Sequence, residues 1–188
     1  MKTLLKLSFL AFAILIGINA GAQSATSTMY SYNGIERGLR FGIKAGVNIS
    51  GFTGDNTESL RVSSDQTGFN VGIFMEYTSS SNLYFLTGLD YTTKTEEVYL
   101  QLPIHIGYKI GLTDNINLGY HLGPYLAQSL TGGDLDLGLG LGMDLYISKF
   151  RIGMGYDWGL TDTYYTYNNG EESGFKNRNF SINIGYTF

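Results

Sequence analysis

The stretch Leu137–Ile147, LGLGLGMDLYI, sets large apolar residues against small or polar ones at every second position. Successive side chains of a β-strand point to opposite faces, so a period of two is typical of a strand whose two faces differ. The same alternation recurs along the chain and predicts eight strands. They span residues 40–52, 67–77, 83–92, 98–110, 116–127, 137–147, 150–160 and 180–188.

The links between these strands alternate in length. The short links are 79–82, 111–115 and 148–149, and the longer, mostly polar ones are 53–66, 93–97, 128–136 and 161–177. Short turns at one rim and longer loops at the other are typical of a bacterial outer-membrane barrel, whose tilted strands cross the bilayer with about 9–11 residues each. The sequence therefore predicts an all-β fold, an eight-stranded antiparallel transmembrane up-and-down β-barrel, over residues 39–188.

Alternation alone leaves open which face points outward, because a soluble lipocalin-like barrel would turn its apolar face inward around a ligand. Two features favour the membrane barrel. Glycine on the polar face suits the narrow interior of eight strands, and aromatic residues on the apolar face gather near the strand ends, as interfacial girdles require. The aromatic residues near the short turns are Phe41, Tyr77, Tyr108 and Phe188, and those near the long loops are Phe69, Tyr91, Trp158 and Phe180.

Composition narrows the functional classes. Of the 188 residues, 15% are charged and 14% aromatic, no residue is cysteine, and the formal net charge is −4. The absence of cysteine excludes a disulfide framework and thiolate chemistry. The acidic balance argues against a nucleic-acid partner, which would call for a basic face.

The first segment has the order of a secretory signal. Lys2 and Lys6 precede the apolar run Leu7–Ile18, and Ala20-Gly21-Ala22 supplies the small residues of a cleavage site. The run of 12 residues is shorter than the roughly 20 that a membrane-spanning helix needs. We expect a signal peptide over 1–22 cleaved after Ala22, a periplasmic N-terminal tail over 23–38, and a place in the cell outer membrane.

The stretch Tyr99–Lys109, YLQLPIHIGYK, resembles the "YLxIP…YK" strand of the PorT-like outer-membrane β-barrel family. Gly123-Pro124-Tyr125, the glycine-rich 137–143 and the terminal 177–188 are similar to that family too. The resemblance implies an outer-membrane barrel and a signal at Phe188 for the outer-membrane assembly machinery. It also accounts for Pro103, whose missing N–H predicts a bulge or a locally unpaired position within its strand.

Motifs for catalysis are absent from the sequence. Gly138, Gly140 and Gly142 lack the last glycine of a nucleotide-binding G-x-G-x-x-G, and close packing in a narrow lumen explains them better. Neither His105 nor His121 has the serine two residues later that a His-x-Ser lipid deacylase would use. We expect no enzyme activity, no catalytic residues, no cofactor and no metal.

The inner face of the predicted barrel carries charged residues and histidines. If Ile110 pairs with Ile116, His105 and His121 face each other in the lumen. They are then either a metal pair or pH-sensitive gate, or lumen side chains sharing hydrogen bonds, and we favour the second. Opposite charges in a confined lumen should pair and plug it, since an unpaired buried ion is costly. This lumen polar network comprises Lys44, Glu76, Asp90, His105, Lys109, His121, Asp144, Arg151 and Asp157.

The outer loops are the remaining place for activity. The link from Thr161 to Lys176 holds Tyr164, Tyr165 and Tyr167, which suit contact residues but equally an extended girdle or a mobile loop. We predict a structural or interaction protein whose extracellular loops contact an envelope or extracellular protein. Outer-membrane lipid would surround the barrel. The alternative is a binder or conduit for a small apolar or lipid ligand at the barrel mouth.

Overall fold

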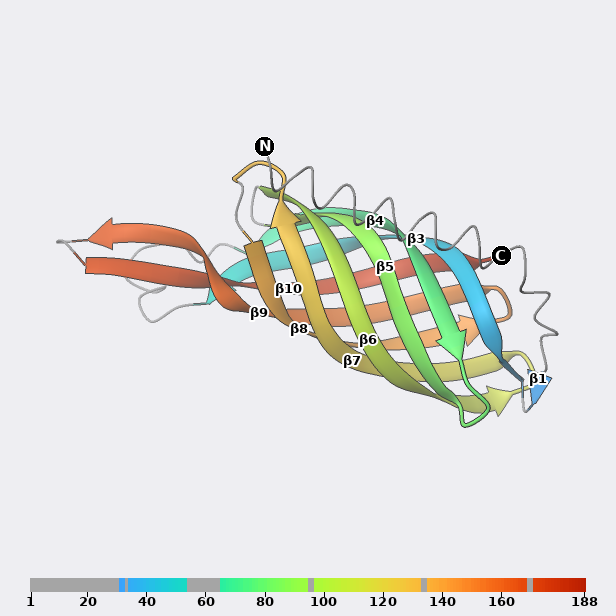
Figure 1. The fold of residues 1–188 in the computed structure, drawn as a ribbon. Coiled ribbons are helices and arrows are strands. Elements are labelled where there is room, and N and C mark those ends of the chain that lie inside the picture. Colours follow the sequence, from blue (N-terminus) through green and yellow to red (C-terminus); the bar gives the residue numbers. More distant parts are fainter. Residues whose placement is uncertain (1–30, 33, 54–64, 95–96, 133–134, 169–170) are drawn as a thin grey trace, which may run out of the picture.

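The computed structural model describes residues 31–32, 34–53, 65–94, 97–132, 135–168 and 171–188. Eight antiparallel strands close into a barrel in the order β10-β3-β4-β5-β6-β7-β8-β9, which confirms the predicted architecture (Figure 1). A separate pair, β1 and β2, precedes it. The strands are β1 Ser31–Tyr32, β2 Ile35–Glu36, β3 Gly38–Thr53, β4 Gln66–Thr78, β5 Leu83–Lys94, β6 Glu97–Thr113, β7 Ile116–Ser129, β8 Leu135–Ile147, β9 Phe150–Asn168 and β10 Glu171–Thr187.

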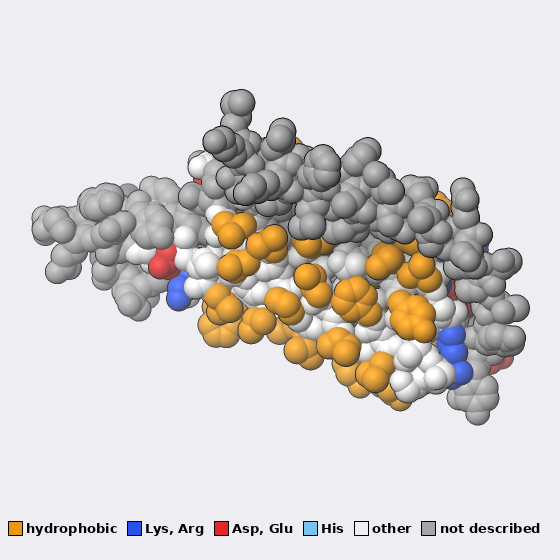
Figure 2. All heavy atoms as spheres, viewed as in Figure 1, with side chains coloured by type: hydrophobic (Ala, Val, Ile, Leu, Met, Phe, Trp, Pro, Cys, Tyr) orange, Lys and Arg blue, Asp and Glu red, His pale blue; other side chains and the backbone are white. Residues whose placement is uncertain are grey.

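The outer face of the barrel is apolar. Figure 2 shows hydrophobic side chains over the middle of the molecule, with charged side chains toward its two ends. On β8, Leu139 and Leu141 are 51% and 61% exposed, whereas Asp144 is 1% exposed. The apolar face therefore points outward, as a lipid-facing barrel requires, and this overturns the alternative of a soluble barrel with an apolar interior. The described residues contain no helix long and apolar enough to span a membrane.

Aromatic side chains line this outer face near the rims. The rings of Tyr108 and Tyr120, on adjacent strands, have centroids 6.2 Å apart, and those of Phe69 and Tyr91 are 6.1 Å apart. Trp158, on the long-loop side, is also exposed. Aromatic rings with a polar edge sit well at the level of lipid headgroups, so the two rims match the two interfaces of a bilayer.

Pro103 leaves a gap in the sheet but does not shift its register. Thr87 pairs with Ile104 and Asp90 with Gln101, so the ladder between β5 and β6 keeps the same register on both sides of the proline. No ladder pair joins Pro103 to β5, and its carbonyl oxygen accepts a hydrogen bond from Thr87 Oγ1 at 2.7 Å. Of the two predicted possibilities, the unpaired position is confirmed and the bulge is wrong.

The predicted register between β6 and β7 is wrong by two residues. Ile110 pairs with Leu118, and Thr113 rather than Ile110 pairs with Ile116 across an irregularity after Gly111. The reason is a tighter turn than predicted. Thr113 Oγ1 accepts the backbone N–H of Ile116 at 3.1 Å, which lets β6 continue to its rim.

Several strands also run further than predicted. The predicted loop 161–177 is wrong, because β9 continues to Asn168 and β10 begins at Glu171, forming a hairpin that projects beyond the barrel (Figure 1). β5 reaches Lys94 and β8 begins before Asp136, so these two residues lie in strands and not in the predicted links.

Part of the predicted N-terminal tail is ordered against the short-turn rim. Ile35 is 1% exposed, and the backbone oxygen of Gly34 accepts a hydrogen bond from Asn117 Nδ2 at 2.8 Å. Gly34 has a φ of 73°, and its backbone lies against the carbonyls of Thr113 and Asp114. The predicted signal peptide, most of the 53–66 link and the side chains of residues 163–173 lie outside the described part of the chain.

Candidate functional site: the barrel lumen

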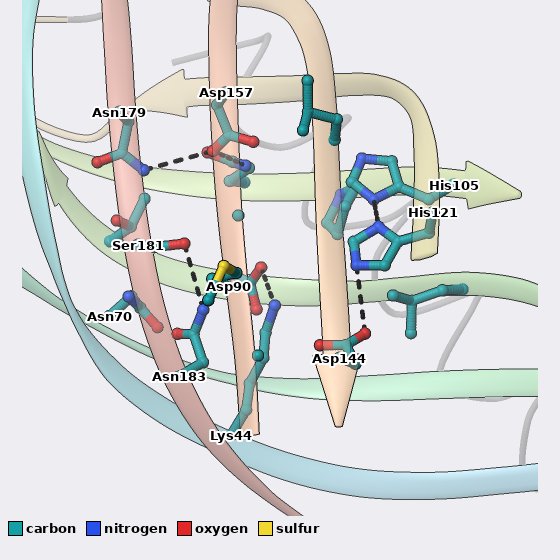
Figure 3. Close-up of a pocket in the computed structure, with 18 of the residues that line it drawn as sticks. Lys44, Asn70, Asp90, His105, His121, Asp144, Asp157, Asn179, Ser181 and Asn183 are labelled. Carbon is teal, nitrogen blue, oxygen red and sulfur yellow. Dashed lines mark hydrogen bonds and ion pairs between the residues drawn. The ribbon is translucent and has the colours of Figure 1, made fainter. Parts of the chain in front are cut away.

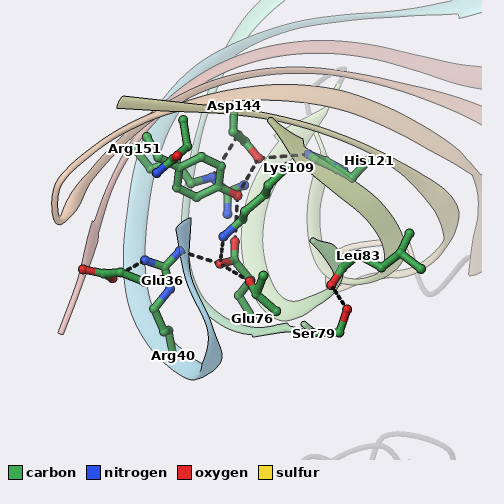
Figure 4. Close-up of polar contacts among 12 residues, drawn as sticks. Glu36, Arg40, Glu76, Ser79, Leu83, Lys109, His121, Asp144 and Arg151 are labelled. Atoms are coloured by element: carbon green, nitrogen blue, oxygen red, sulfur yellow. Dashed lines mark hydrogen bonds and ion pairs between the residues drawn. The ribbon is translucent and has the colours of Figure 1, made fainter. Parts of the chain in front are cut away.

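A buried carboxylate organises the lumen near the short turns. Glu76, on β4, is 0% exposed and forms ion pairs with Arg40 of β3 at 2.6 Å and with Lys109 of β6 (Figure 4). Tyr146 of β8 donates a hydrogen bond to the second Glu76 oxygen at 2.7 Å. Arg40 also reaches Glu36 at 2.6 Å, a residue of β2, which is not part of the barrel sheet. Four barrel strands thus meet at one anion; we call this group the Glu76 cluster.

A second charged group borders the Glu76 cluster. Arg151 Nε lies 2.9 Å from Asp144 Oδ1 across the tight β8–β9 turn, and Tyr146 pairs with Arg151 in the ladder. The other Asp144 oxygen lies 3.3 Å from His121 Nε2. The Arg151 guanidinium lies over the ring of Phe74, with its carbon 4.9 Å from the ring centroid.

The two histidines lie inside the barrel and contact each other. His105 and His121 are diagonal neighbours rather than direct partners, since Gly107 pairs with His121. Their rings stack at 23°, and the two Nδ1 atoms are 2.8 Å apart. One hydrogen lies between the two Nδ1 atoms, so one imidazole donates to the other, and His121 Nε2 donates to the Asp144 carboxylate.

Two further carboxylates lie at mid-barrel. Asp90 Oδ2 is 2.8 Å from Lys44 Nζ, so this pair is internally neutral. Asp157 Oδ2 accepts hydrogen bonds from Gln101 Nε2 at 3.0 Å and from Asn179 Nδ2 at 3.4 Å (Figure 3). Among the described residues, no cation lies within ion-pair distance of Asp157.

The long-loop end of the lumen is closed by another buried carboxylate. Asp136 lies 3.3 Å from Lys94 Nζ, and both side chains are 0% exposed. Tyr125 OH donates to Asp136 at 3.2 Å, as does Asn177 Nδ2. Lys94 Nζ also lies 4.6 Å from the centroid of the Tyr125 ring, in a cation–π arrangement. We call this group the Asp136 cluster.

The glycines of β8 make room for these side chains. A Cβ atom on Gly138 would lie 2.5 Å from the Tyr125 ring, and one on Gly142 would lie 2.5 Å from Cε1 of His121. A Cβ on Gly140 would lie 2.8 Å from His105 Nε2. The glycine periodicity therefore serves close packing, because any larger residue would collide with an aromatic or imidazole ring.

A chamber of about 70 Å3 remains between the two clusters. That is room for a few water molecules. Figure 3 shows the side chains that surround it, five of which carry a fully buried polar atom without a hydrogen-bond partner. These atoms are Asp90 Oδ1, Gln101 Oε1, His105 Nε2, Asn183 Oδ1 and Arg151 Nη1.

All nine side chains of the predicted lumen network lie inside the barrel, but their contacts form three separate groups rather than one network. Lys44 and Asp90 form one group, and Asp157 with its two amide partners forms another. The other six residues are connected through Tyr146.

The sequence analysis did not include Arg40, Lys94 and Asp136, although each is fully or almost fully buried. For Arg40 and Asp136, the alternation of inward and outward positions along the strand could have predicted an inward side chain. Arg40 shares the inner face of β3 with Lys44, and Asp136 shares that of β8 with Asp144. The described residues contain no cluster of three His, Cys, Asp or Glu side chains that could hold a metal ion.

A closed antiparallel barrel with an apolar outer face and a charged, tightly packed lumen defines the class of membrane β-barrels. The model of one protein family, described as "Outer membrane protein beta-barrel domain", matches residues 9–188. This chain belongs to that family, and it is a small eight-stranded barrel of the outer membrane.

Solved structures with a similar arrangement include three bacterial proteins. Neisserial surface protein A is 15% identical, covering 81% of this chain and 100% of its own, with a TM-score of 0.45. Ail of Yersinia pestis, solved with the heparin analogue sucrose octasulfate, is 14% identical over 80% of this chain and 99% of its own, with a TM-score of 0.45. OprG of Pseudomonas aeruginosa is 14% identical over 84% of this chain and 99% of its own, with the same TM-score of 0.45. No curated protein matches the chain in sequence.

Proposed function

We propose that this protein is a non-enzymatic structural or interaction protein whose lumen is plugged and whose extracellular loops contact an envelope or extracellular protein. The observation that carries the proposal is the β9–β10 hairpin. Ladder pairing of β9 with β8 extends to Gly159, and that of β10 with β3 extends to Lys176. Beyond these residues the two strands pair with each other up to Asn168 and Glu171.

The hairpin offers backbone edges to a partner. In the described part of the chain, no third strand pairs with its outer edges beyond the rim. An open edge can accept an extended segment of another protein through main-chain hydrogen bonds. The predicted contact residues Tyr164, Tyr165 and Tyr167 belong to this projecting part of β9.

The interior argues for a plug. The Glu76 and Asp136 clusters lie toward the two ends of the lumen, and the chamber between them measures about 70 Å3. Pockets for small molecules measure roughly 300–1,000 Å3, so a chamber of this size leaves little room for the alternative of an apolar ligand or conduit. In planar lipid bilayers we expect no conductance steps, and regular steps from the wild-type protein would refute the plug.

Shortening the hairpin tests the interaction role. Tyr164 already pairs with Phe175, so removing 165–168 and 171–174 lets Asn169-Gly170 join two paired residues. Asn-Gly is a preferred two-residue hairpin turn, and the variant should keep the heat-modifiable migration of a folded barrel. A photo-crosslinking residue at position 165 in full-length protein should capture a partner on intact cells. A shortened variant with the crosslinker at 164 should capture none, and equal capture by both would contradict the proposal.

The proposal also includes membership of the PorT-like family, recognition by the assembly machinery and cleavage of the signal peptide. The Tyr99–Lys109 strand and the outward-facing Phe188 support a place in the PorT-like family and recognition by the outer-membrane assembly machinery. Export would remove residues 1–22. N-terminal sequencing of protein from the outer-membrane fraction should then begin at Gln23, and a sequence beginning at Met1 would contradict the cleavage.

A further inference from the structure

We propose that the short β1–β2 hairpin is a periplasmic lid, which closes the short-turn end of the lumen and opens while the barrel itself stays closed. β1 and β2 form a two-stranded sheet of their own, and among the described residues no ladder pair joins them to the barrel sheet. The lid lies at the opposite end of the barrel from the β9–β10 hairpin (Figure 1). The inference therefore goes beyond the proposed interaction role and does not depend on it.

One apolar side chain anchors the lid to the barrel. Ile35 is 1% exposed, although it belongs to a strand of only two residues outside the barrel sheet. A side chain this buried needs neighbours on several sides, and so short a hairpin cannot supply them alone. Lifting the lid would return Ile35 to water, and the loss of that burial favours the closed position.

The backbone of Gly34 seats the lid against the β6–β7 turn. Its carbonyl oxygen accepts a hydrogen bond from Asn117 Nδ2 at 2.8 Å. A Cβ atom on Gly34 would lie 2.4 Å from the carbonyl oxygen of Thr113 and 2.6 Å from that of Asp114. Its φ of 73° also lies in a region that other residues seldom adopt. A glycine is therefore required at this position for the lid to reach the rim.

A third contact joins the lid to the Glu76 cluster. Glu36 and Glu76 each lie 2.6 Å from the Arg40 guanidinium, on either side of it (Figure 4). Lys109 is the other cation that pairs with Glu76. With the lid open, Arg40 and Lys109 would share Glu76 alone, because Glu36 would move away with the lid. The closed lid therefore supplies a second carboxylate to two buried cations, and the lost ion pair opposes opening.

The lid is held more loosely than a strand of the barrel. Every barrel strand pairs with a neighbour on each side, whereas the described contacts of the lid lie within Gly34–Glu36 at one rim. Segments with few packed contacts open at a lower free energy than the cooperative sheet beside them. The Glu76 cluster spans four barrel strands behind the lid, so opening exposes that cluster without clearing the lumen.

Single-cysteine labelling measures the opening, because the chain has no cysteine of its own. A cysteine in Ile35→Cys is buried under the closed lid, and a water-soluble maleimide can reach it only when the lid opens. Ser80→Cys, in the exposed β4–β5 turn at the same rim, sets the fast limit, and Ser50→Cys, at a position 1% exposed on the inner face of β3, sets the slow one. In lipid nanodiscs, full-length protein should be modified at position 35 at an intermediate rate. A rate equal to either limit would overturn the proposal.

Glu36→Gln, added to Ile35→Cys, tests the contact with Arg40. The Glu36 side chain is 38% exposed, so loss of the ion pair should raise the labelling rate about threefold to fivefold. The barrel should keep its folded gel migration, and Ser50→Cys should stay unmodified. Asp65→Asn, at the exposed pair with Arg178, is the matched control and should leave the rate at position 35 unchanged. The same rate in both backgrounds would contradict a lid held by Glu36.

Hydrogen exchange of the wild-type protein covers the case in which Ile35→Cys itself loosens the lid or does not fold. The amide proton of Ile35, which pairs with Tyr32, should exchange more slowly than an unprotected amide but faster than that of Val47 at the middle of β3. Exchange as slow as at Val47 would mean that the lid opens only with the barrel. Exchange at the unprotected rate would mean that the lid is not closed, and either result would refute the proposal.

Discussion

The Glu76 and Asp136 clusters both stabilise a buried carboxylate, but they use different donors. Each has an almost completely buried carboxylate, and in each a lysine lies over two tyrosine rings. For the nearer ring, Lys109 Nζ lies 4.2 Å from the Tyr146 centroid, and Lys94 Nζ lies 4.6 Å from that of Tyr125. The difference lies in the second donor. Arg40 adds a second cation to the Glu76 cluster, whereas the Asp136 cluster uses neutral hydroxyl and amide donors.

This difference shows how much depends on one residue. Removing Glu76 would leave Arg40 and Lys109 close together without their shared anion. Removing Lys94 would leave Asp136 still hydrogen-bonded by Tyr125 and Asn177. A network that shares one anion between two cations is therefore more sensitive to substitution than a pair supported by neutral donors.

Glu76→Gln should have the largest effect on stability. The amide cannot neutralise Arg40 and Lys109, so we expect a loss of about 3–5 kcal/mol of unfolding free energy. Urea unfolding in lipid vesicles, followed by gel migration, measures this loss. Asp65→Asn, at an exposed pair with Arg178, should cost about 0–1 kcal/mol and serves as the control. Equal midpoints for the two variants would remove the contrast between buried and exposed anions.

Lys94→Met should cost less, about 2–3 kcal/mol, because Asp136 keeps two neutral donors. Adding Asp136→Asn should restore most of the loss, since the remaining amide is uncharged and still accepts from Tyr125. The same urea titration measures both variants.

The matching double variant at the other end sharpens the comparison. Glu76→Gln with Lys109→Met leaves Arg40 without an anion inside the barrel, so it should restore little. If both double variants regain the same unfolding free energy, Glu36 alone compensates the charge of Arg40. The two clusters would then be equally sensitive to substitution.

Gly142→Ala should disturb the region between the clusters by about 1–2 kcal/mol. The new methyl group would meet the His121 ring at 2.5 Å, so the ring must leave Asp144 or His105. Gly155→Ala on β9 is a matched control, because its methyl group would lie 3.3 Å from the nearest atom, Ser181 Oγ. Chemical shifts of the imidazole nitrogens should change in the first variant only.

Thr87→Val should have the smallest effect, about 0.5–1 kcal/mol. It removes the hydroxyl that donates to the Pro103 carbonyl beside the gap in the ladder. Amide exchange should accelerate at Ile104 and Gln101 and stay unchanged at Tyr108 on the same strand. Uniform acceleration along β6 would mean that the gap is not a local weakness.

Strand type, strand number and the inward face were predictable because a membrane barrel imposes a strict period of two on nearly every residue. Strand length was less predictable. Lys94 and Asp136 lie past the span that a bilayer requires, and nothing in the local alternation marks where β5 and β8 stop. Their burial follows from pairing with each other across the lumen, which is a tertiary property.

The hairpin and the histidine register show two different causes of error. Residues 161–168 are rich in threonine and tyrosine, which favour strands, and Asn169-Gly170 is a strong turn signal. The hairpin was therefore encoded locally, but its polar composition resembled a loop. The contact between His105 and His121 arises although they are not opposite each other, because imidazole rings reach diagonal neighbours on one face.

The seam between β10 and β3 has a consequence for how the chain folds. Seven of the eight strand pairings in the barrel join consecutive strands, whereas this one joins residues as distant as Tyr186 and Ile43. Local hairpins close quickly, but a pairing across the whole sheet must wait for the strand that comes last in sequence. Until then β3 exposes an unpaired edge that could pair with another chain. Closure of the barrel is therefore expected to come late in folding, after the local hairpins have formed.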